Sequence, residues 1–371
     1  MTTIAVVGLG TMGLGIAQTY AAAGFSALAT DAVPTTGATA LDRLRDGLAP
    51  RVAAGKLSQA GLDGLLARVT VVPSLQEMGR ADLVIEAVVE NIDIKRALFA
   101  ALEAVIAPDA VLATNTSSLS VASMARALLH PERLLGLHFF NPAPVMKLVE
   151  LVAHTRTAAS ALDKARHLTE ATGKTVIACP DRPGFIVNRC ARPFYGEALA
   201  LLEQGRSASD IDAAMLAAGY RLGPFALIDL IGADINLATS ESLSAAMANH
   251  PRYHVFDALR RQVARGDLGR KSGRGFLFPH PPGPAPADAG AIVARIEAAL
   301  VNEAGWLLSE GGTTPAGIDT AMKLGLNFPR GPFEIGRARA ASLLPALAGY
   351  EASAPAHLRG RYRPAPGLEE T

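Results

Sequence analysis

Residues 3–24, TIAVVGLGTMGLGIAQTYAAAG, constrain the fold more than any other stretch of the chain. The apolar run over 3–7 is typical of a buried strand, and a helix-like run follows the glycines. Gly8, Gly10 and Gly13 fit the pattern G-x-G-x-x-G. In such a unit the first glycine makes the tight turn, the second lets a pyrophosphate approach the backbone, and the third lets the helix pack closely on the strand. The segment therefore predicts the first βα unit of a dinucleotide-binding sheet.

An acidic residue follows at the spacing that this interpretation requires. The strand-like run SALATD ends on Asp31, and a carboxylate about 20 residues after the glycines is the group that binds the ribose hydroxyls of NAD. Residues 32–34 are Ala-Val-Pro, so no arginine follows to bind a 2′-phosphate. We therefore expect NAD, rather than NADP, as the cofactor.

Strand-like and helix-like segments alternate up to about residue 180. A helical segment lies at 95–106, and short apolar or β-branched runs lie at 68–72, 82–87, 110–115, 134–140, 147–153 and 175–179. This alternation predicts an α/β fold, a Rossmann-like doubly wound parallel sheet over 1–182. We expect an all-α C-terminal domain over 183–278, a Pro/Gly/Ala linker over 279–290, and a second, shortened copy of the helical domain over 291–371.

The second copy is expected because residues 196–232 recur at 302–338. Both segments contain Glu-Ala, a glycine turn, Ile-Asp followed by Ala-Met, and Gly-Pro-Phe. In each copy the Ile and the Met stand four residues apart, which places them on one face of a helix. Since LGRKSGRGF has no counterpart in the second copy, we expect that copy to bury surface without catalytic residues of its own.

Composition argues against several classes of function. The chain has 35 basic and 34 acidic residues, so we expect no nucleic-acid partner. Its two cysteines, Cys179 and Cys190, have no neighbours at zinc spacing, and we expect neither a disulfide framework nor a metal site. The sequence shows no cleavable leader and no long apolar run, so we expect a cytoplasmic protein that does not cross a membrane.

Two ionisable residues, His138 and Glu150, lie in apolar strand-like runs on either side of the turn NPAP. A carboxylate on a buried strand needs a partner, because an unpaired buried charge is costly. His138 is the nearest candidate. From the residues alone two interpretations stay open: a His–Glu pair, or an exposed glutamate on an edge strand with an unrelated core histidine.

Seven segments together closely resemble the 3-hydroxyacyl-CoA dehydrogenase family, which includes L-3-hydroxyacyl-CoA and 3-hydroxybutyryl-CoA dehydrogenases. They stand in the family's order over residues 1 to about 278: GLGTMG, IEAVVENIDIKRALFAALE, ATNTSSLS, GLHFFNPAPVMKLVEL, DRPGFIVNR, GPFALIDLIG and LGRKSGRGF. The resemblance implies an NAD-dependent oxidoreductase of fatty-acid β-oxidation that converts L-3-hydroxyacyl-CoA to 3-ketoacyl-CoA.

The resemblance also implies roles for the matching residues. His138 would be the general base that takes the proton from the substrate's 3-hydroxyl as hydride leaves for the nicotinamide. Glu150 would orient the imidazole and stabilise the imidazolium. Asn188 would present its amide to the substrate oxygen from the second domain.

Ser117 would bind the reacting oxygen. The run NTSSLS is also typical of a capped helix start. Thr116 and Ser118 can serve as those caps, which leaves Ser117 for the substrate.

Further matches concern the cofactor and the acyl carrier. The family positions near the cofactor are occupied here by Glu90, Lys95, Asn141 and Lys271. Family members usually carry a lysine-rich helix that binds the CoA phosphates. Here that segment reads RVAAGKL, and the cations available to CoA are Arg51 and Lys56.

Three alternatives are weighed beside this interpretation. The same His–Glu chemistry could act on a non-CoA secondary alcohol, such as a sugar acid or a carnitine-like compound, or the chain could be a non-enzymatic NADH-binding protein similar to a lens crystallin. GLGTMG also resembles free β-hydroxyacid dehydrogenases, but these need a lysine on the connecting helix and none occurs from Asp181 to Tyr220. We expect an acyl-CoA substrate and a homodimer formed through the helical domains.

Overall fold

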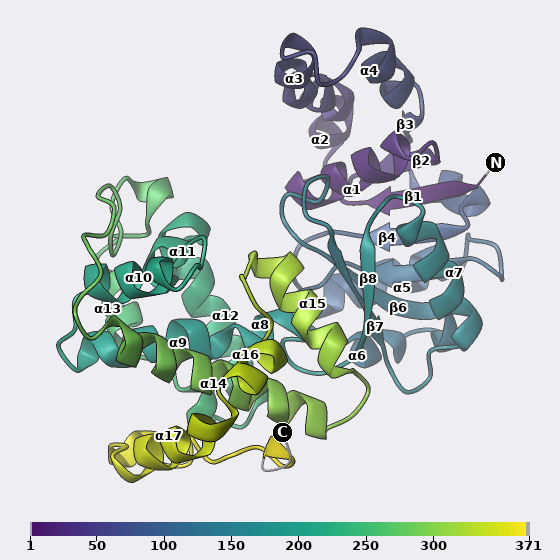
Figure 1. Cartoon of the computed structure of the whole chain (residues 1–371). Helices are drawn as coiled ribbons and strands as arrows, with labels where there is room; N and C mark the ends of the chain where they lie inside the picture. Colours follow the sequence, from purple (N-terminus) through teal and green to yellow (C-terminus); the bar gives the residue numbers. More distant parts are fainter. Residues whose placement is uncertain (1, 369–371) are drawn as a thin grey trace. The chain divides into compact units, whose positions relative to one another are not determined.

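The computed structural model describes residues 2–368 and divides into two compact units, Met1–Arg182 and Pro183–Thr371 (Figure 1). The first unit contains the sheet, and the second is helical. None of the helices within residues 2–368 is long and apolar enough to span a membrane.

The first unit is built on one eight-stranded sheet with the order β3-β2-β1-β4-β5-β6-β7-β8. This confirms the predicted α/β fold with a doubly wound sheet. The central strands are buried along their whole length, as expected for parallel strands covered on both faces. The strands are β1 (Thr3–Val7), β2 (Ser26–Thr30), β3 (Val69–Val71), β4 (Leu83–Glu86), β5 (Val111–Thr114), β6 (Leu134–Phe139), β7 (Leu148–Ala153) and β8 (Thr175–Pro180).

One pair of neighbours departs from the predicted parallel arrangement: β6 and β7 are antiparallel. Only residues 140–147 join these two strands, and a parallel connection needs a crossover of about a dozen residues or more. The chain therefore turns back as a hairpin. β7 then pairs with β8 in parallel, because the connection between them includes a helix.

Helices cover the sheet and extend from it, and the apolar core of the unit lies between them and the strands. The long α1 and α5 follow β1 and β4, as in βαβ units. The helices of this unit are α1 (Thr11–Ala22), α2 (Pro34–Ala38), α3 (Ala40–Ala53), α4 (Gln59–Leu66), α5 (Ile92–Glu103), α6 (Val121–Ala125) and α7 (Ala159–Glu170).

The second unit consists of ten α-helices and short 3-10 turns within the described residues. Residues 279–288 contain no helix or strand, and α14 begins directly after them. The helices are α8 (Val187–Cys190), α9 (Arg192–Glu203), α10 (Ala208–Ala217), α11 (Pro224–Ile231), α12 (Ala233–Ala246), α13 (Asp257–Ala264), α14 (Ala289–Ser309), α15 (Pro315–Leu326), α16 (Pro332–Ala338) and α17 (Ala340–Ala352).

The structure explains why both copies contain the motifs Ile-Asp and Gly-Pro-Phe. Asp212 accepts two backbone N–H groups at the start of α11, at 2.9 and 2.7 Å, and Asp319 accepts two at the start of α16, at 2.7 and 3.2 Å. The glycine of each Gly-Pro-Phe lets the aspartate approach. A Cβ on Gly223 would lie 2.3 Å from the carboxyl carbon of Asp212, and one on Gly331 would lie 2.4 Å from Asp319. Each copy therefore uses one helix to cap the start of the next.

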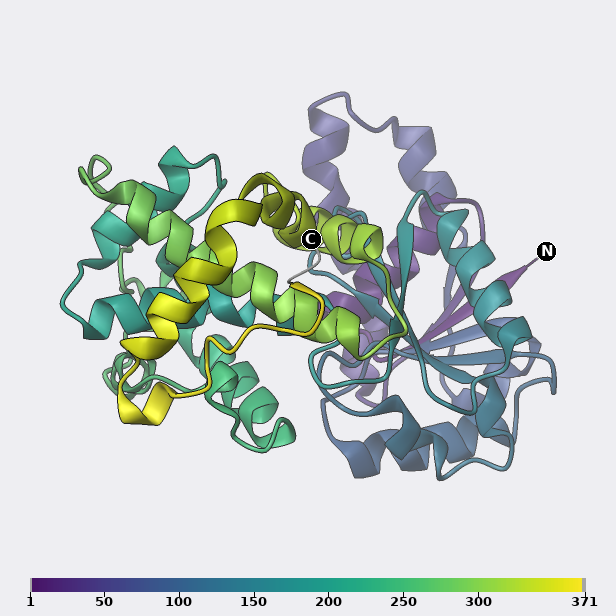
Figure 2. The same ribbon diagram turned by 60° about the horizontal axis from the view of Figure 1, so that its bottom comes forward.

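The two copies contact each other through reciprocal buried ion pairs. α14 of the second copy lies against α9 of the first (Figures 1 and 2). Arg189 Nε donates to Glu303 at 2.8 Å, and Arg295 Nε donates to Glu197 at 2.8 Å. In each copy the arginine stands eight residues before the glutamate. Each copy thus supplies its arginine to the glutamate of the other.

A second element of each copy repeats this exchange. The Arg-Tyr pair at 252–253 contacts Glu303: the tyrosine hydroxyl donates a hydrogen bond at 2.5 Å, and Nε of Arg252 forms an ion pair at 3.0 Å. The Arg-Tyr pair at 361–362 contacts Glu197, with the hydroxyl donating at 2.8 Å and the guanidinium at 2.6 Å. Both glutamates are almost fully buried. The two copies therefore meet as the halves of an isologous two-fold interface do, within one chain.

Candidate functional site

The glycine loop between β1 and α1 has the geometry that close approach of a dinucleotide requires. Gly8 has a φ of +94°, and a Cβ there would lie 2.7 Å from the carbonyl oxygen of Ala87. A Cβ on Gly13 would lie 1.7 Å from the carbonyl oxygen of Gly8, so only glycine lets α1 pack this closely. A Cβ placed on Gly10 would have no neighbouring atom within 4 Å. The backbone at the N-terminus of α1 is therefore open to a phosphate.

Asp31 stands directly after β2, beside this loop. Its carboxylate accepts the Leu9 N–H at 2.6 Å and the Val33 N–H at 2.8 Å. These bonds fix its orientation, and a carboxylate retains further acceptor sites for ribose hydroxyls. The loop and this carboxylate fit the pyrophosphate and the adenosine ribose of NAD.

A buried charge network, which sequence reasoning did not fully predict, follows β4. Lys95 is 1% exposed, and its Nζ lies 2.6 Å from Glu86 and 3.2 Å from Glu90. Glu86, at the end of β4, also accepts the Thr114 hydroxyl at 2.7 Å. Lys95 is thus held between two carboxylates. In this geometry Lys95 positions Glu90. The sequence did not reveal Glu86 as a member of the network, because a glutamate in an apolar run carries no local signal of its partner.

Glu90 holds the loop that follows β5. Its carboxylate accepts the Thr116 hydroxyl at 2.5 Å, the Ser117 N–H at 3.1 Å and the Ser118 hydroxyl at 3.0 Å. Burial tends to raise the pKa of Glu90, but these hydroxyls and the charge of Lys95 outweigh it and hold the pKa below its usual range. An ionised Glu90 therefore fixes the backbone of Ser117 at the carboxyl end of the sheet.

Neither Thr116 nor Ser118 caps helix α6, although Thr116 accepts backbone N–H groups as a cap does, from Ser118 at 3.3 Å and from Leu119 at 2.9 Å. Thr116 and Ser118 direct their hydroxyls to Glu90, and α6 is capped by Ser120, which accepts the Ser123 N–H at 3.2 Å. Asp181 reinforces this helix start, since its carboxylate accepts the N–H groups of residues 121 and 122 at 3.0 and 2.7 Å. The Thr116 hydroxyl thus donates to Glu90 and also caps a turn that precedes α6.

His138 and Glu150 form a buried pair across the β6–β7 hairpin. They are opposite each other in the antiparallel register, and Nδ1 of the imidazole lies 2.6 Å from Oε2 of the carboxylate. His138 is 6% exposed and Glu150 is not exposed at all. Because β7 lies between β6 and β8, the alternative of an exposed glutamate on an edge strand is excluded. Asn115 also contacts this strand, by accepting the Phe139 N–H at 2.9 Å.

The remaining matched residues of the first unit lie at its surface. Asn141 lies two residues after the end of β6 and is exposed. Arg51 lies in the last turn of α3 and Lys56 in the turn after it, and both are exposed. The structure thus groups the glycine loop with Asp31, groups Ser117 with the Glu90 network, and keeps Arg51 and Lys56 on a separate helical hairpin.

Asn188 and Lys271 belong to the second unit. Asn188 is half-buried in α8, and its carbonyl oxygen accepts Nε of Arg192 at 3.0 Å. Lys271 lies 2.5 Å from Asp234, and this hydrogen bond is the main reason why the pKa of Asp234 lies below its usual range. The carboxylate of Asp229 fixes the following loop by accepting the N–H groups of residues 276–278 at 2.8 Å.

Residues 3–182 match the NAD binding domain of 3-hydroxyacyl-CoA dehydrogenase, and residues 184–278 and 290–370 match the C-terminal domain of the same family. The chain is 44% identical over 275 residues to 3-hydroxyadipyl-CoA dehydrogenase of Escherichia coli (strain K12), a match that covers 74% of this chain and 58% of that protein. It is 38% identical to the probable 3-hydroxybutyryl-CoA dehydrogenase of Bacillus subtilis (strain 168), over 74% of this chain and 96% of that one.

Among solved structures, 3-hydroxybutyryl-CoA dehydrogenase from E. coli K12 is similar along the whole chain. The TM-score is 0.91 at 32% identity, and the match covers 100% of this chain and 98% of that one. The similarity therefore extends over both units and the second helical copy.

Proposed function

Because the chain belongs to the 3-hydroxyacyl-CoA dehydrogenase family, we propose that it oxidises L-3-hydroxyacyl-CoA thioesters to 3-ketoacyl-CoA with NAD as cofactor. The observation that carries the proposal is the buried hydrogen bond of 2.6 Å between His138 Nδ1 and Glu150 Oε2. Such a pair prepares an imidazole for proton transfer. The open backbone at Gly10 and the carboxylate of Asp31 support the choice of cofactor.

In this proposal His138 takes the proton from the substrate's 3-hydroxyl. Glu150 accepts the Nδ1–H, so the tautomer is fixed and Nε2 exchanges the proton with the substrate. The carboxylate also stabilises the imidazolium as it forms, and the pair lies in a buried position where this attraction is strong. NAD, when bound, accepts the hydride from C3. In the reverse direction His138 returns the proton to the ketone oxygen.

Two further residues would bind the reacting oxygen. The backbone of Ser117 is fixed by the Glu90 carboxylate, which leaves its hydroxyl in a loop of defined position. Asn188 would supply its amide from the second unit. Glu90, Lys95, Asn141 and Lys271 would serve the cofactor, with Lys95 acting through Glu90 rather than by direct contact.

A second candidate function has one specific observation in its favour. In the segment that resembles the CoA-binding helix, Arg51 and Lys56 are the only cations, and both are exposed. A non-CoA secondary alcohol, such as a sugar acid or a carnitine-like compound, has no CoA phosphates and would need no further cations in this segment. The acyl carrier is therefore the part of the proposal that most needs testing.

The test is NADH consumption with acetoacetyl-CoA, compared with free acetoacetate and with a keto-sugar acid. We expect turnover of the thioester alone, and loss of that turnover in the His138→Gln variant with NADH binding retained. Turnover of a free acid alone would move the chain to the second candidate. Turnover unchanged in His138→Gln would remove the histidine from the mechanism.

Assembly and location complete the proposal. We also propose a cytoplasmic location, which agrees with the proposed reactants because NAD and CoA thioesters are intracellular metabolites. The homodimer through the helical domains stays a prediction, and it needs a surface other than the one where Arg189 and Glu303 already meet within the chain. Sedimentation of the native protein distinguishes a particle of 38.5 kDa from one of twice that mass.

A further inference from the structure

Arg192 carries a buried positive charge that no carboxylate of its unit neutralises. It is the first residue of α9 and is 9% exposed. Its Nε donates to the carbonyl oxygen of Asn188 at 3.0 Å, and its Nη1 donates to the hydroxyl of Ser240 at 3.0 Å. The guanidinium carbon lies 4.8 Å from the centre of the Tyr195 ring. All three partners are neutral, and within residues 2–368 no carboxylate oxygen lies within 4.0 Å of this guanidinium.

Other deeply buried arginines of the same unit are compensated. Arg189 contacts Glu303 at 2.8 Å, and Arg361 contacts Glu197 at 2.6 Å. Burial lowers the pKa of Arg192, but a guanidinium remains charged at neutral pH. Burying a charge without a counter-charge costs several kcal/mol. The position therefore indicates an anion that the chain itself does not supply.

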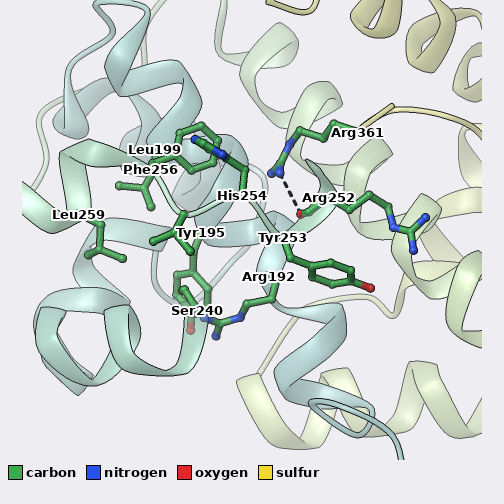
Figure 3. A pocket seen from close by; sticks show the side chains of 12 residues that line it. Arg192, Tyr195, Leu199, Ser240, Arg252, Tyr253, His254, Phe256, Leu259 and Arg361 are labelled. Carbon is green, nitrogen blue, oxygen red and sulfur yellow. Dashed lines mark hydrogen bonds between the residues drawn. The ribbon is translucent and has the colours of Figure 1, made fainter. Parts of the chain in front are cut away.

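A cavity beside Arg192 has room for such an anion. Its volume is about 20 Å³, and one water molecule needs about 10–15 Å³ by this measure, so it holds a group of one or two water-sized atoms. Arg192 and Ser240 lie together at one side of it (Figure 3). No acidic side chain is among the described residues that line it, which include Arg192, Tyr195, Ser240, His254, Phe256 and Leu259.

Arg192 also lies next to the proposed substrate-binding residue. It begins α9, four residues after Asn188 in α8, and its Nε donates to the backbone carbonyl of Asn188 at 3.0 Å. In an acyl group bound at Asn188 by its 3-oxygen, the three bonds from C3 to C6 cover about 4 Å. A carboxylate at about the sixth carbon is therefore within reach of the guanidinium. A longer apolar chain does not fit the small, cationic cavity.

We propose that Arg192, supported by Ser240, binds the distal carboxylate of a dicarboxylic L-3-hydroxyacyl-CoA and makes this substrate preferred over one that ends in a methyl group. The inference rests on the proposed function, because it places the acyl chain at Asn188. Arg192 acts on specificity here and takes no part in the hydride or proton transfer.

The test compares two substrates of equal chain length, L-3-hydroxyadipyl-CoA and L-3-hydroxyhexanoyl-CoA. For the wild-type enzyme we expect kcat/KM to be about 10- to 100-fold higher for the dicarboxylic substrate, the range that charge-assisted hydrogen bonds provide. In Arg192→Met this preference should disappear, mainly through KM, while kcat/KM for the hexanoyl substrate stays within about threefold of wild type. Ser240→Ala should weaken the preference less, and Arg261→Gln, at an exposed arginine of α13, is the matched control.

The outcomes separate the inference from the proposed function. If wild type turns over both substrates with equal kcat/KM, the proposed function stands and the inference is overturned, whether or not the Arg192 variant folds. A loss of kcat/KM for both substrates alike in a folded Arg192→Met would also overturn it, because that pattern indicates a structural role. If wild type turns over neither thioester, the proposed function fails and the inference fails with it.

Discussion

Replacing Glu150 with glutamine removes the charge of the His138–Glu150 pair and keeps its shape. The two side chains are buried, with 2.6 Å between Nδ1 and Oε2. When the substrate's proton reaches His138, an imidazolium forms beside the carboxylate. For charge centres about 4 Å apart and an effective dielectric constant of about 20, their attraction is about 4 kcal/mol. The glutamine keeps a neutral hydrogen bond of about 1 kcal/mol. The transition state therefore loses about 3 kcal/mol, which is about 100-fold in kcat.

The assay is steady-state NADH formation from NAD and L-3-hydroxybutyryl-CoA, the direction in which His138 starts neutral and becomes an imidazolium. KM should change little, because the carboxylate acts on a charge that is present in the transition state and absent from the bound ground state. Glu132→Gln is the matched control, since Glu132 contacts His130 at 3.2 Å in an exposed His–Glu pair of the same unit. That variant should keep wild-type kcat.

A double variant gives the decisive comparison. Glu150 acts through His138, so adding Glu150→Gln to His138→Gln should lower kcat by no more than about threefold beyond the single His138→Gln variant. If the two losses multiply instead, the carboxylate acts on catalysis independently of the imidazole and the reasoning is refuted. Thermal unfolding and NADH binding show whether each variant is folded.

Four further predictions concern the cofactor site and stability. Asp31→Ala should reduce the preference for NAD over NADP by about tenfold, because the ribose loses its carboxylate; an unchanged ratio of kcat/KM values would remove Asp31 from the site. Lys95→Met should lower the free energy of unfolding by about 3–5 kcal/mol in urea titrations, since it leaves the buried carboxylate of Glu86 without its cation. Glu303→Gln should cost a similar amount, because Arg252 loses its carboxylate and Arg189 keeps only Glu310, and a loss below about 1 kcal/mol would contradict the importance of these pairs. Burial raises the pKa of Asp212 from 3.8 to about 7, so the folded state binds this proton more tightly than the unfolded chain. Its contribution to stability is complete below about pH 3.8 and is lost as the pH rises through about 7; Asp212→Asn should flatten this part of the Tm profile, and a profile of unchanged slope would count against the shift.

The parts of the molecule that the sequence predicts well are those with local signals. The glycines of the first turn specify a strand–helix unit because no other residue tolerates the approach found at Gly8 and Gly13. The strands of the sheet are apolar runs of a typical length between helices. The pairing of His138 with Glu150 was within reach because a short turn joins their strands. The same turn is too short for a parallel crossover, so its length also predicts the antiparallel β6–β7 pair.

What the sequence does not predict depends on partners far apart in the chain. Thr116 and Ser118 look like caps of the next helix, but their hydroxyls donate to the distant Glu90, and the helix is capped by Ser120. Arg192 looks like an ordinary charged residue at a helix start, and its isolation becomes visible only when the neighbouring helices are in place. The ion pair between Arg189 and Glu303 cannot be predicted from the sequence either. The repeat shows which segments of the two copies correspond, but it does not show that the two copies contact each other.

The exchanged ion pairs of the two helical copies have a consequence for how the chain can evolve. In a symmetric dimer every substitution appears on both sides of the interface at once, and association depends on concentration. Here each side is encoded separately, so Glu197 and Glu303 can change one at a time, and the tether keeps the halves together at any dilution. Selection can then preserve the second copy for its contacts alone. In the second copy the Arg-Tyr pair at 361–362 is kept for its contact with Glu197.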